Sequence, residues 1–157
     1  MRSLRLIWIG KTQEYFVKTG IGIYQKKLSN YIKVNSEEIK PAQYGLVAVD
    51  QCRRQETGKI LKRLNPNEIN VFLDEKGKRA TSIGLARWFE KLFHKGNSKI
   101  NFFIGGAYGF EKSLLPDGVH FLSLSDMTFT HQMVRLILLE QLYRAFTIIR
   151  GEPYHHI

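Results

Sequence analysis

Residues 102–110, FFIGGAYGF, place three glycines directly after an apolar run. Glycine permits positive φ and lets another group approach the backbone closely. Gly105 and Gly106, at the end of a predicted buried strand, are therefore typical of a ligand-binding turn. A tight turn or close packing without a ligand explains the same residues, and both interpretations stay open. The spacing matches neither a Walker loop nor the dinucleotide fingerprint.

A second candidate for ligand chemistry is residues 124–130, LSDMTFT. This stretch mixes small hydroxyl side chains and one carboxylate with the apolar Leu124, Met127 and Phe129. Such a loop can wrap an adenine, with backbone groups reading the edge of the base and apolar side chains covering its face. An ordinary connection into a helix, capped by Thr128 or Thr130, also accounts for these residues and is favoured when they are taken alone.

The last predicted helix, HQMVRLILLEQLYRAFTIIR (131–150), carries polar residues on two faces of an otherwise apolar segment. His131 and Arg135 share one face, while Glu140, Arg144 and Thr147 share roughly the opposite face at 3.6 residues per turn. Glu140 and Arg144 can form a simple i, i+4 ion pair. On a helix this apolar, which should be largely buried, two polar faces more typically meet a site or a second subunit.

The carboxyl-terminal residues GEPYHHI are unusual for a frayed end. Tyr154, His155 and His156 can stack on a base, bind phosphate or move a proton near neutral pH. A disordered terminus is the alternative. Two other histidines, His94 and His120, have no cysteine or carboxylate partners at ligand spacing, so we expect no metal site.

The composition bounds these possibilities. A chain of 157 residues with 43% hydrophobic residues suits a single domain, 1–157, with its own core. The formal net charge of +10 favours a polyanionic partner such as nucleic acid, although a basic chain can also simply be soluble. The sequence shows no long apolar run and no secretory signal, and Cys52 is the only cysteine. We therefore expect a cytoplasmic protein that does not enter membranes.

The candidate residues need elements to position them. Apolar runs predict strands at 4–10, 69–74, 99–106 and 120–125, with a poorly patterned strand at 32–40 and a turn at EKGK, 75–78. Helical spacing predicts helices over 12–31, 50–64 and 131–150, and another that begins at an N-cap, Ser82. Unbroken apolar strands that alternate with helices predict an α/β fold, a parallel sheet covered by helices on both faces. In such sheets ligands bind at the carboxyl ends of the strands.

The sequence resembles the RlmH family of ribosomal RNA methyltransferases, within the knotted SPOUT class. The matching stretches cover essentially the whole chain: FLDEKGK (72–78), FFIGGAYGF (102–110), LSLSDMTFTHQMVRLILLEQLYRAF (122–146) and RGEPYHH (150–156). The resemblance implies a carboxyl-terminal trefoil knot, a homodimer, and S-adenosylmethionine held in the knot. It implies methylation at N3 of a pseudouridine in 23S ribosomal RNA on the assembled ribosome.

The resemblance also assigns positions. It implies a set of cofactor-binding residues: Leu73, Gly105, Leu124, Ser125, Asp126, Met127, Thr128 and Phe129. Around the target nucleotide it places His131, Glu140, Arg144, Tyr154 and His155, with the tail of one subunit completing the site of the other. The chain departs from the family's frequent proline and glutamate at Ala107 and Tyr108, and from its frequent proline at Thr130. These changes affect the rigidity of two cofactor loops.

The implied reaction needs the target nitrogen to lose a weakly acidic proton. We hypothesise that His155 assists this loss, that Arg144 stabilises negative charge on the base, and that Glu140 orients Arg144. Tyr154 would stack on the base. Two alternatives remain, a non-enzymatic ribosome-binding factor and a small nucleotide- or flavin-binding protein. The glycines and the 124–129 loop argue against the first, and the positive charge and histidine-bearing tail argue against the second.

Overall fold

The computed structural model describes residues 1–156, and within them five strands form one parallel sheet in the order β2-β1-β4-β3-β5. Every neighbouring pair of strands is parallel. The strands are β1 (Ser3–Ile9), β2 (Lys33–Ile39), β3 (Ile69–Arg79), β4 (Lys99–Ile104) and β5 (His120–Ser123). Because all strands run in one direction, their carboxyl ends meet at a single edge of the sheet.

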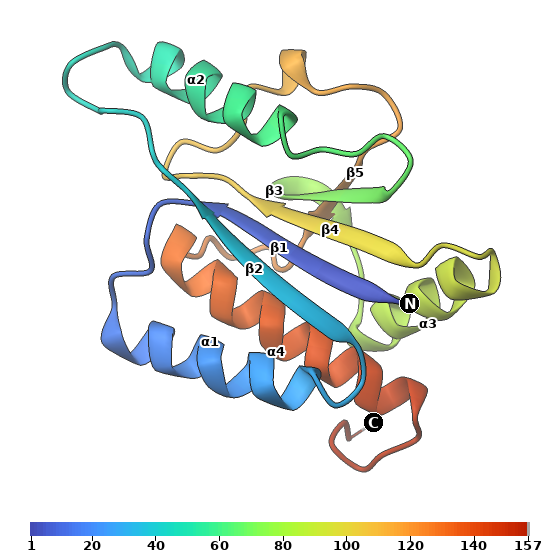
Figure 1. Ribbon diagram of the computed structural model, residues 1–157. Coiled ribbons are helices and arrows are strands. Elements are labelled where there is room, and N and C mark those ends of the chain that lie inside the picture. Colours follow the sequence, from blue (N-terminus) through green and yellow to red (C-terminus); the bar gives the residue numbers. More distant parts are fainter. Residues whose placement is uncertain (157) are drawn as a thin grey trace.

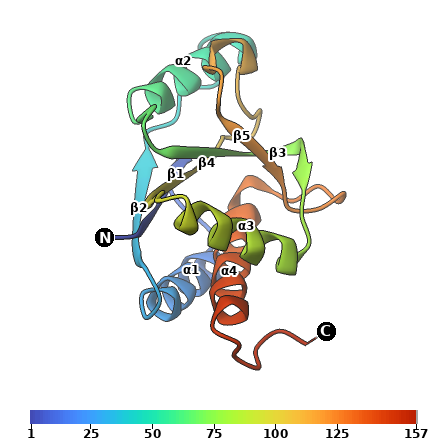
Figure 2. The same cartoon turned by 90° about the vertical axis from the view of Figure 1, so that its right-hand side faces the viewer.

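Helices cover both faces of this sheet (Figure 1). One face carries α1 (Tyr15–Leu28), α3 (Ser82–His94) and α4 (His131–Ile149), and α4 packs against both of the others. The opposite face carries α2 (Val49–Leu61) and the short 3-10 helix η1 (Lys112–Leu114), as the view in Figure 2 shows. This arrangement confirms the predicted α/β class, whereas the trefoil knot stays a prediction. Within the described residues, no helix is both long and apolar enough to cross a membrane.

The alternating side chains of the strands build a separate core on each face. On β1, Leu4, Leu6 and Trp8 join the larger core under α1, α3 and α4, while Ile7 and Ile9 join a smaller core under α2. Since both faces are covered, neither set of alternating positions faces water. This is why the strands appear in the sequence as unbroken apolar runs.

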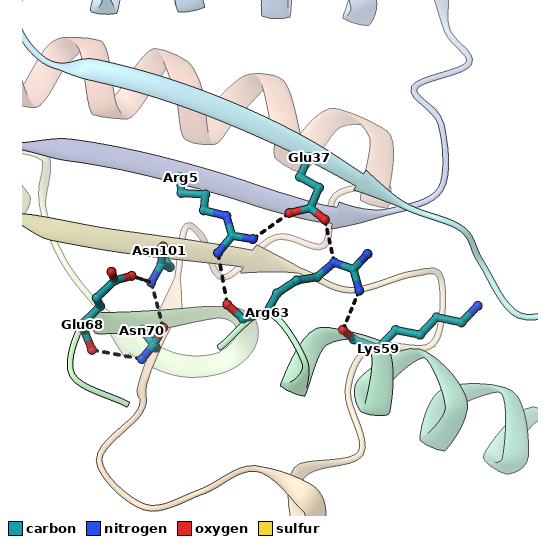
Figure 3. A network of polar contacts seen from close by, with 7 residues as sticks. All are labelled: Arg5, Glu37, Lys59, Arg63, Glu68, Asn70 and Asn101. Atoms are coloured by element: carbon teal, nitrogen blue, oxygen red, sulfur yellow. Dashed lines mark hydrogen bonds and ion pairs between the residues drawn. The ribbon is translucent and has the colours of Figure 1, made fainter. Parts of the chain in front are cut away.

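A polar network lies on the face of the sheet that carries the smaller core, and it extends from the starts of β3 and β4 to the carboxyl half of β2 (Figure 3). The carboxylate of Glu37 lies between two guanidinium groups, accepting from Arg5 Nη2 at 2.7 Å and from Arg63 Nε at 2.6 Å. On the neighbouring strands, Asn101 donates to Asn70 at 3.0 Å. These bonds tie the end of α2 to the sheet and so fix the helix that faces the smaller core.

Two local expectations are wrong. The EKGK segment is not a terminal turn, because β3 continues through it to Arg79 with a shift in its pairing to β5 between Leu73 and Lys78. An added Cβ on Gly77 would lie 2.7 Å from the Leu122 backbone, so glycine is what lets the two strands approach there. In addition, Thr81 caps α3 by accepting from the Gly84 amide at 2.9 Å. Ser82 is the first helical residue.

Candidate active site

A cavity of about 600 Å³ opens at the carboxyl ends of β4 and β5 and beside the middle of β3. Its wall includes His131 at the start of α4. Most of the residues predicted to bind a cofactor line it: Leu73, Gly105, Leu124, Ser125, Met127, Thr128 and Phe129. Asp126 does not line the cavity. Its carboxylate instead forms an ion pair at 2.5 Å with Arg79, and both side chains are exposed.

Hydroxyl groups hold the loop between β5 and α4 in shape. Buried Ser123 donates to the carbonyl of Ser125 at 3.0 Å, and the Ser125 hydroxyl accepts from the Met127 amide at 2.9 Å. Thr130 caps α4 by accepting from the Met133 amide at 3.2 Å. Of the two capping residues considered for this helix, Thr130 is therefore the one used. Side chains of the loop itself and of its two ends therefore hold the loop in shape.

The glycines of FFIGGAYGF have a structural cause. A Cβ on Gly105 would lie 3.2 Å from the Gly109 backbone, and one on Gly106 would lie 2.9 Å from Oε1 of Glu56. Gly109 has a φ of +72°, and its amide donates to the carbonyl of Gly106 at 3.1 Å. A tight turn packed on a buried carboxylate thus requires these glycines. Gly105 and Gly106 nevertheless line the cavity.

Asp74 is a cavity residue absent from the predicted set. Its carboxylate forms an ion pair with Lys112 and accepts from the Lys76 amide at 2.9 Å. Burial acts to raise the pKa of Asp74, but the bonds from Lys112 and Lys76 outweigh it and hold that pKa below its usual range. The cavity wall therefore holds an ionised carboxylate that is paired with the ammonium of Lys112. A carboxylate directly after the buried run INVFL, at the end of the predicted strand 69–74, was the available sequence signal.

Two polar residues of the last helix do not serve a site. Arg135 is 0% exposed and donates to the carbonyl of Ile9 at 2.7 Å and to Thr12 Oγ1 at 2.9 Å. It fastens α4 to the end of β1. Thr147 is also buried, and its hydroxyl donates to the carbonyl of Arg144. The expectation that these two residues face a ligand or a second subunit is wrong.

His131, one turn before Arg135, differs because it faces the cavity. Burial is the main cause that lowers the pKa of His131, and the positive charge of Arg135 adds to it against an opposing effect of Glu56. Burial therefore favours the neutral form of the imidazole. A neutral ring can donate or accept one hydrogen bond at the cavity wall.

The other predicted catalytic residues form a cluster at the far end of α4. Oε1 of Glu140 accepts from Arg144 through Nε at 3.1 Å and Nη2 at 2.5 Å, and from the Tyr154 hydroxyl at 3.0 Å. Nη1 of Arg144 lies 3.2 Å from Nδ1 of His155. The hydrogen bond to Glu140 is the main cause that raises the pKa of Arg144. We call Glu140, Arg144, Tyr154 and His155 the tail cluster.

The backbone explains why the tail folds back. Gly151 has a φ of +70° and ends α4, with its amide donating to Ile148 and the next amide, of Glu152, donating to Thr147. The chain then returns along the helix, and the Tyr154 ring lies 4.7 Å from that of Tyr143. Contacts made by Glu152, Tyr154 and His155 therefore hold the tail against α4.

The cavity and the tail cluster are well separated within one chain. At a rise of 1.5 Å per residue, Glu140 and Arg144 lie about 14 and 20 Å further along the α4 axis than His131. The structure therefore does not bring all five predicted catalytic residues together in one subunit. Over residues 1–156, no group of three or more histidine, cysteine, aspartate or glutamate side chains is placed to hold a metal ion.

Comparisons with known proteins agree with this architecture. A family model described as "Predicted SPOUT methyltransferase" matches residues 2–155. The chain is similar to the ribosomal RNA large subunit methyltransferase H of Geotalea daltonii, with 46% identity over 98% of this chain and 99% of the relative. It is also similar to the proteins of that name from Acetivibrio thermocellus, at 44% identity over 97% and 98% of the two chains, and from Halothermothrix orenii, at 44% over 98% and 99%. The cavity at the carboxyl edge of a parallel sheet therefore occurs in a chain that belongs to the SPOUT methyltransferase family.

Proposed function

We propose that this protein is a cytoplasmic, S-adenosylmethionine-dependent methyltransferase that modifies N3 of a pseudouridine in 23S ribosomal RNA on the assembled ribosome. The observation that carries the proposal is the cavity between Leu73, Gly105 and the 124–129 loop. It lies where parallel sheets bind ligands, in a chain nearly half identical to proteins named ribosomal RNA methyltransferases. Residues 1–157 would act as one domain.

The lining of the cavity suits this cofactor. Leu73, Leu124 and Val134 offer apolar walls for the faces of an adenine, and the backbone of the ordered 124–129 loop offers donors and acceptors for its edge. The ionised carboxylate of Asp74 can accept from hydroxyl groups or pair with an ammonium. When bound, S-adenosylmethionine would supply a methyl group already activated by its sulfonium.

The separation along α4 supports a homodimer. A cavity whose wall on α4 ends at Val134 lies about 15 Å from Arg144 along the helix axis and cannot use that arginine in the same subunit, because the rigid helix holds the two apart. In a two-fold dimer, the tail cluster of one subunit can approach the cavity of its partner, and the same contact occurs twice. We therefore propose that each site combines the cavity of one subunit with the tail of the other.

The tail cluster would prepare the target base. Glu140 holds the Arg144 guanidinium in one orientation, so that its positive charge can stabilise negative charge on the base as N3 loses its proton. His155, held beside Arg144, would receive or relay that proton. Tyr154 would stack on the base. In the subunit that supplies the cavity, His131 would complete the cavity wall. The ordering of both reactants supplies much of the rate, since fixed geometry can contribute about 7–11 kcal/mol.

Charge supports ribosomal RNA as the substrate. A formal net charge of +10 on a chain of this size attracts a polyanion and speeds its encounter with RNA. A body of 157 residues covers only part of an RNA stem-loop, which favours recognition of an assembled surface over free RNA.

The direct test is methyl transfer from labelled S-adenosylmethionine to ribosomes that lack the modification, with free ribosomal RNA in parallel. We expect label only on ribosomes, at N3 of a pseudouridine. Label on free RNA as well would keep the chemistry and remove the requirement for assembly. No label on either, together with no cofactor binding in calorimetry, would overturn the proposal and favour a ribosome-binding factor without enzymatic activity.

A further inference from the structure

Helix α2 buries a carboxylate that the proposed chemistry does not use. Glu56 is 1% exposed, and none of the ion pairs found over residues 1–156 includes it. Its Oε1 accepts from the Tyr44 hydroxyl at 2.6 Å, and its Oε2 accepts from the Ala42 amide at 3.1 Å. Removing a carboxyl group from water is costly, so the burial of Glu56 with two neutral donors and no cationic partner needs an explanation.

The same carboxylate abuts the glycine turn of the cavity. Oε1 of Glu56 would lie 2.9 Å from a Cβ added to Gly106, so the two groups are already in close contact. Tyr44, whose hydroxyl binds Glu56, places its ring 5.3 Å from the ring of Tyr108, which also belongs to the cavity wall. Glu56 thus joins the connection before α2 to the 105–109 turn.

Other residues of α2 hold the far end of the same turn. The Thr57 hydroxyl accepts from the Glu111 amide at 3.0 Å, and Arg53 Nη2 donates to the Glu111 carboxylate at 3.3 Å. Both ends of the segment 105–111 are therefore fixed by one face of α2. We call Arg53, Glu56 and Thr57, together with Tyr44, the α2 brace.

The turn needs such support because of its composition. The sequence GGAYG has three glycines and no proline, and glycine loses more conformational freedom on ordering than any other residue. Within the turn itself, the Gly109 amide makes one backbone bond to Gly106. If the α2 brace already orders the turn in the free protein, no binding free energy is lost in ordering the turn when a ligand binds. The ligand then binds more tightly.

We propose that Glu56 is a positioning residue that acts through Tyr44 and Gly106 to preorganise the 105–109 wall of the cavity, and so sets the affinity for the cofactor. This inference rests on the proposed function, because it takes the cavity to be the cofactor site. Glu56 itself does not line the cavity, so the proposed effect on the position of the wall passes through the turn and is separate from its electrostatic effect on His131.

The test uses the full chain and S-adenosylhomocysteine, a non-reactive probe, in calorimetry. Tyr44→Phe removes the hydroxyl donor and keeps the ring on Tyr108. Tyr31→Phe is the matched control, since it removes an equally short tyrosine-to-carboxylate bond, 2.6 Å to Glu152, next to the far end of α4. We expect the Kd to rise about three- to tenfold in Tyr44→Phe and to stay within about twofold in Tyr31→Phe.

Two further readouts separate positioning from general stability. Hydrogen exchange at the Gly109 amide should accelerate in Tyr44→Phe without ligand and stay unchanged in Tyr31→Phe. Glu56→Gln, which retains one acceptor and gains a donor, should restore most of the affinity lost in Glu56→Ala.

The possible outcomes distinguish the role proposed for Glu56 from the proposed methyltransferase function. Equal Kd values for wild type and Tyr44→Phe, with unchanged exchange at Gly109, would overturn the role of Glu56 and leave the methyltransferase proposal intact. If the wild type binds no probe, the proposed function fails and the inference about affinity fails with it. In that case the exchange data still decide whether the brace orders the turn.

Discussion

Arg144 donates two hydrogen bonds to the same carboxylate oxygen of Glu140, from Nε at 3.1 Å and from Nη2 at 2.5 Å. Both side chains are about three-quarters shielded from solvent, so the pair is better defined than a typical surface i, i+4 contact. The arrangement fixes the plane of the guanidinium and leaves Nη1 beside His155. A cation held in one orientation is suited to stabilising charge that develops on a bound base.

Replacement of Arg144 by alanine should therefore separate catalysis from cofactor binding. We expect turnover to fall about 10²–10³-fold, as when one preorganised donor to a developing charge is lost. The Kd for S-adenosylhomocysteine should change less than about twofold, because Val134, the cavity residue of α4 that is nearest in sequence, lies about 15 Å away along the helix in the same chain. Single-turnover methylation of ribosomes and calorimetry measure the two quantities.

The control for Arg144→Ala is Arg87→Ala, which removes the same charge from an exposed position on α3. It accounts for any loss of general attraction to RNA. If Arg144→Ala weakens cofactor binding as much as turnover, the assignment of Arg144 to the base is wrong.

The close approach of Gly106 to Glu56 predicts a coupled pair of substitutions. Gly106→Ala should lower the free energy of unfolding by about 1–3 kcal/mol, because the new Cβ would meet Glu56 Oε1 at 2.9 Å. In a Glu56→Ala background the nearest remaining atom, Ile9 Cγ2, lies 3.5 Å away, which is an ordinary contact. There the same change should cost less than about 1 kcal/mol.

Urea denaturation of the four proteins in this cycle gives the coupling energy. Gly22→Ala is a useful reference, since a Cβ at this helical position meets no atom within 4 Å. If the losses in free energy of unfolding caused by Gly106→Ala and Glu56→Ala are additive, the carboxylate of Glu56 is not the reason why residue 106 is glycine.

The sequence predicts the strands well where they are buried on both sides. INVFLD and KINFFI do not alternate between apolar and polar residues. The smaller core under α2 and the larger core under α4 each receive about half of their side chains. The second strand is poorly patterned for a physical reason: β2 lies at the edge of the sheet, and its Glu37 pairs with Arg5 and Arg63. EKGK resembles a turn because nothing local reveals that β5 pairs with it.

The sequence predicts some residues of the candidate site better than others. The tail cluster follows from the family resemblance and from helical spacing, because its members are close along the chain or return to it through Gly151. The sequence does not predict the role of Glu56. The stretch RRQETGKILKR (53–63) resembles a solvated basic helix face, and the groups that contact Glu56 belong to other segments, at Ala42, Tyr44 and Gly106. Arg135 was misjudged for the same reason, because its acceptor is the distant carbonyl of Ile9.

The network around Glu37 predicts a loss of stability in acid. Burial acts to raise the pKa of Glu37, but hydrogen bonds from Arg63 and Arg5 outweigh it and hold the pKa below its ordinary value of 4.5. The stabilisation is therefore complete above pH 4.5 and is lost as the pH falls through the lower pKa of the folded state. Glu37→Gln should cost about 0.5–1 kcal/mol at pH 7, a modest figure because the side chain is 34% exposed.

Urea denaturation from pH 7 down to pH 3 tests this dependence. The difference between wild type and Glu37→Gln should shrink as the pH drops below 4.5. Glu38→Gln removes the same charge from the exposed neighbour and should cost less at pH 7. A difference between wild type and Glu37→Gln that is independent of pH would mean that packing, and not the charge of Glu37, is responsible.

The composite site predicts complementation between two inactive subunits. Ser125→Trp should block the cavity, and Arg144→Ala should disable the tail cluster, so each homodimer should be inactive. A heterodimer of the two, isolated with two affinity tags, would combine the intact cavity of one subunit with the intact tail of the other at one of its two sites. We therefore expect about half of the wild-type methylation activity.

The reciprocal heterodimer makes this test decisive. When one subunit is wild type and the other carries both Ser125→Trp and Arg144→Ala, each composite site contains one damaged half, and we expect no activity. If each subunit instead used its own cavity and its own tail, this second heterodimer would have about half of the activity and the first would have none. Because the two geometries predict opposite patterns from the same substitutions, a difference in stability between the variants cannot produce the expected result.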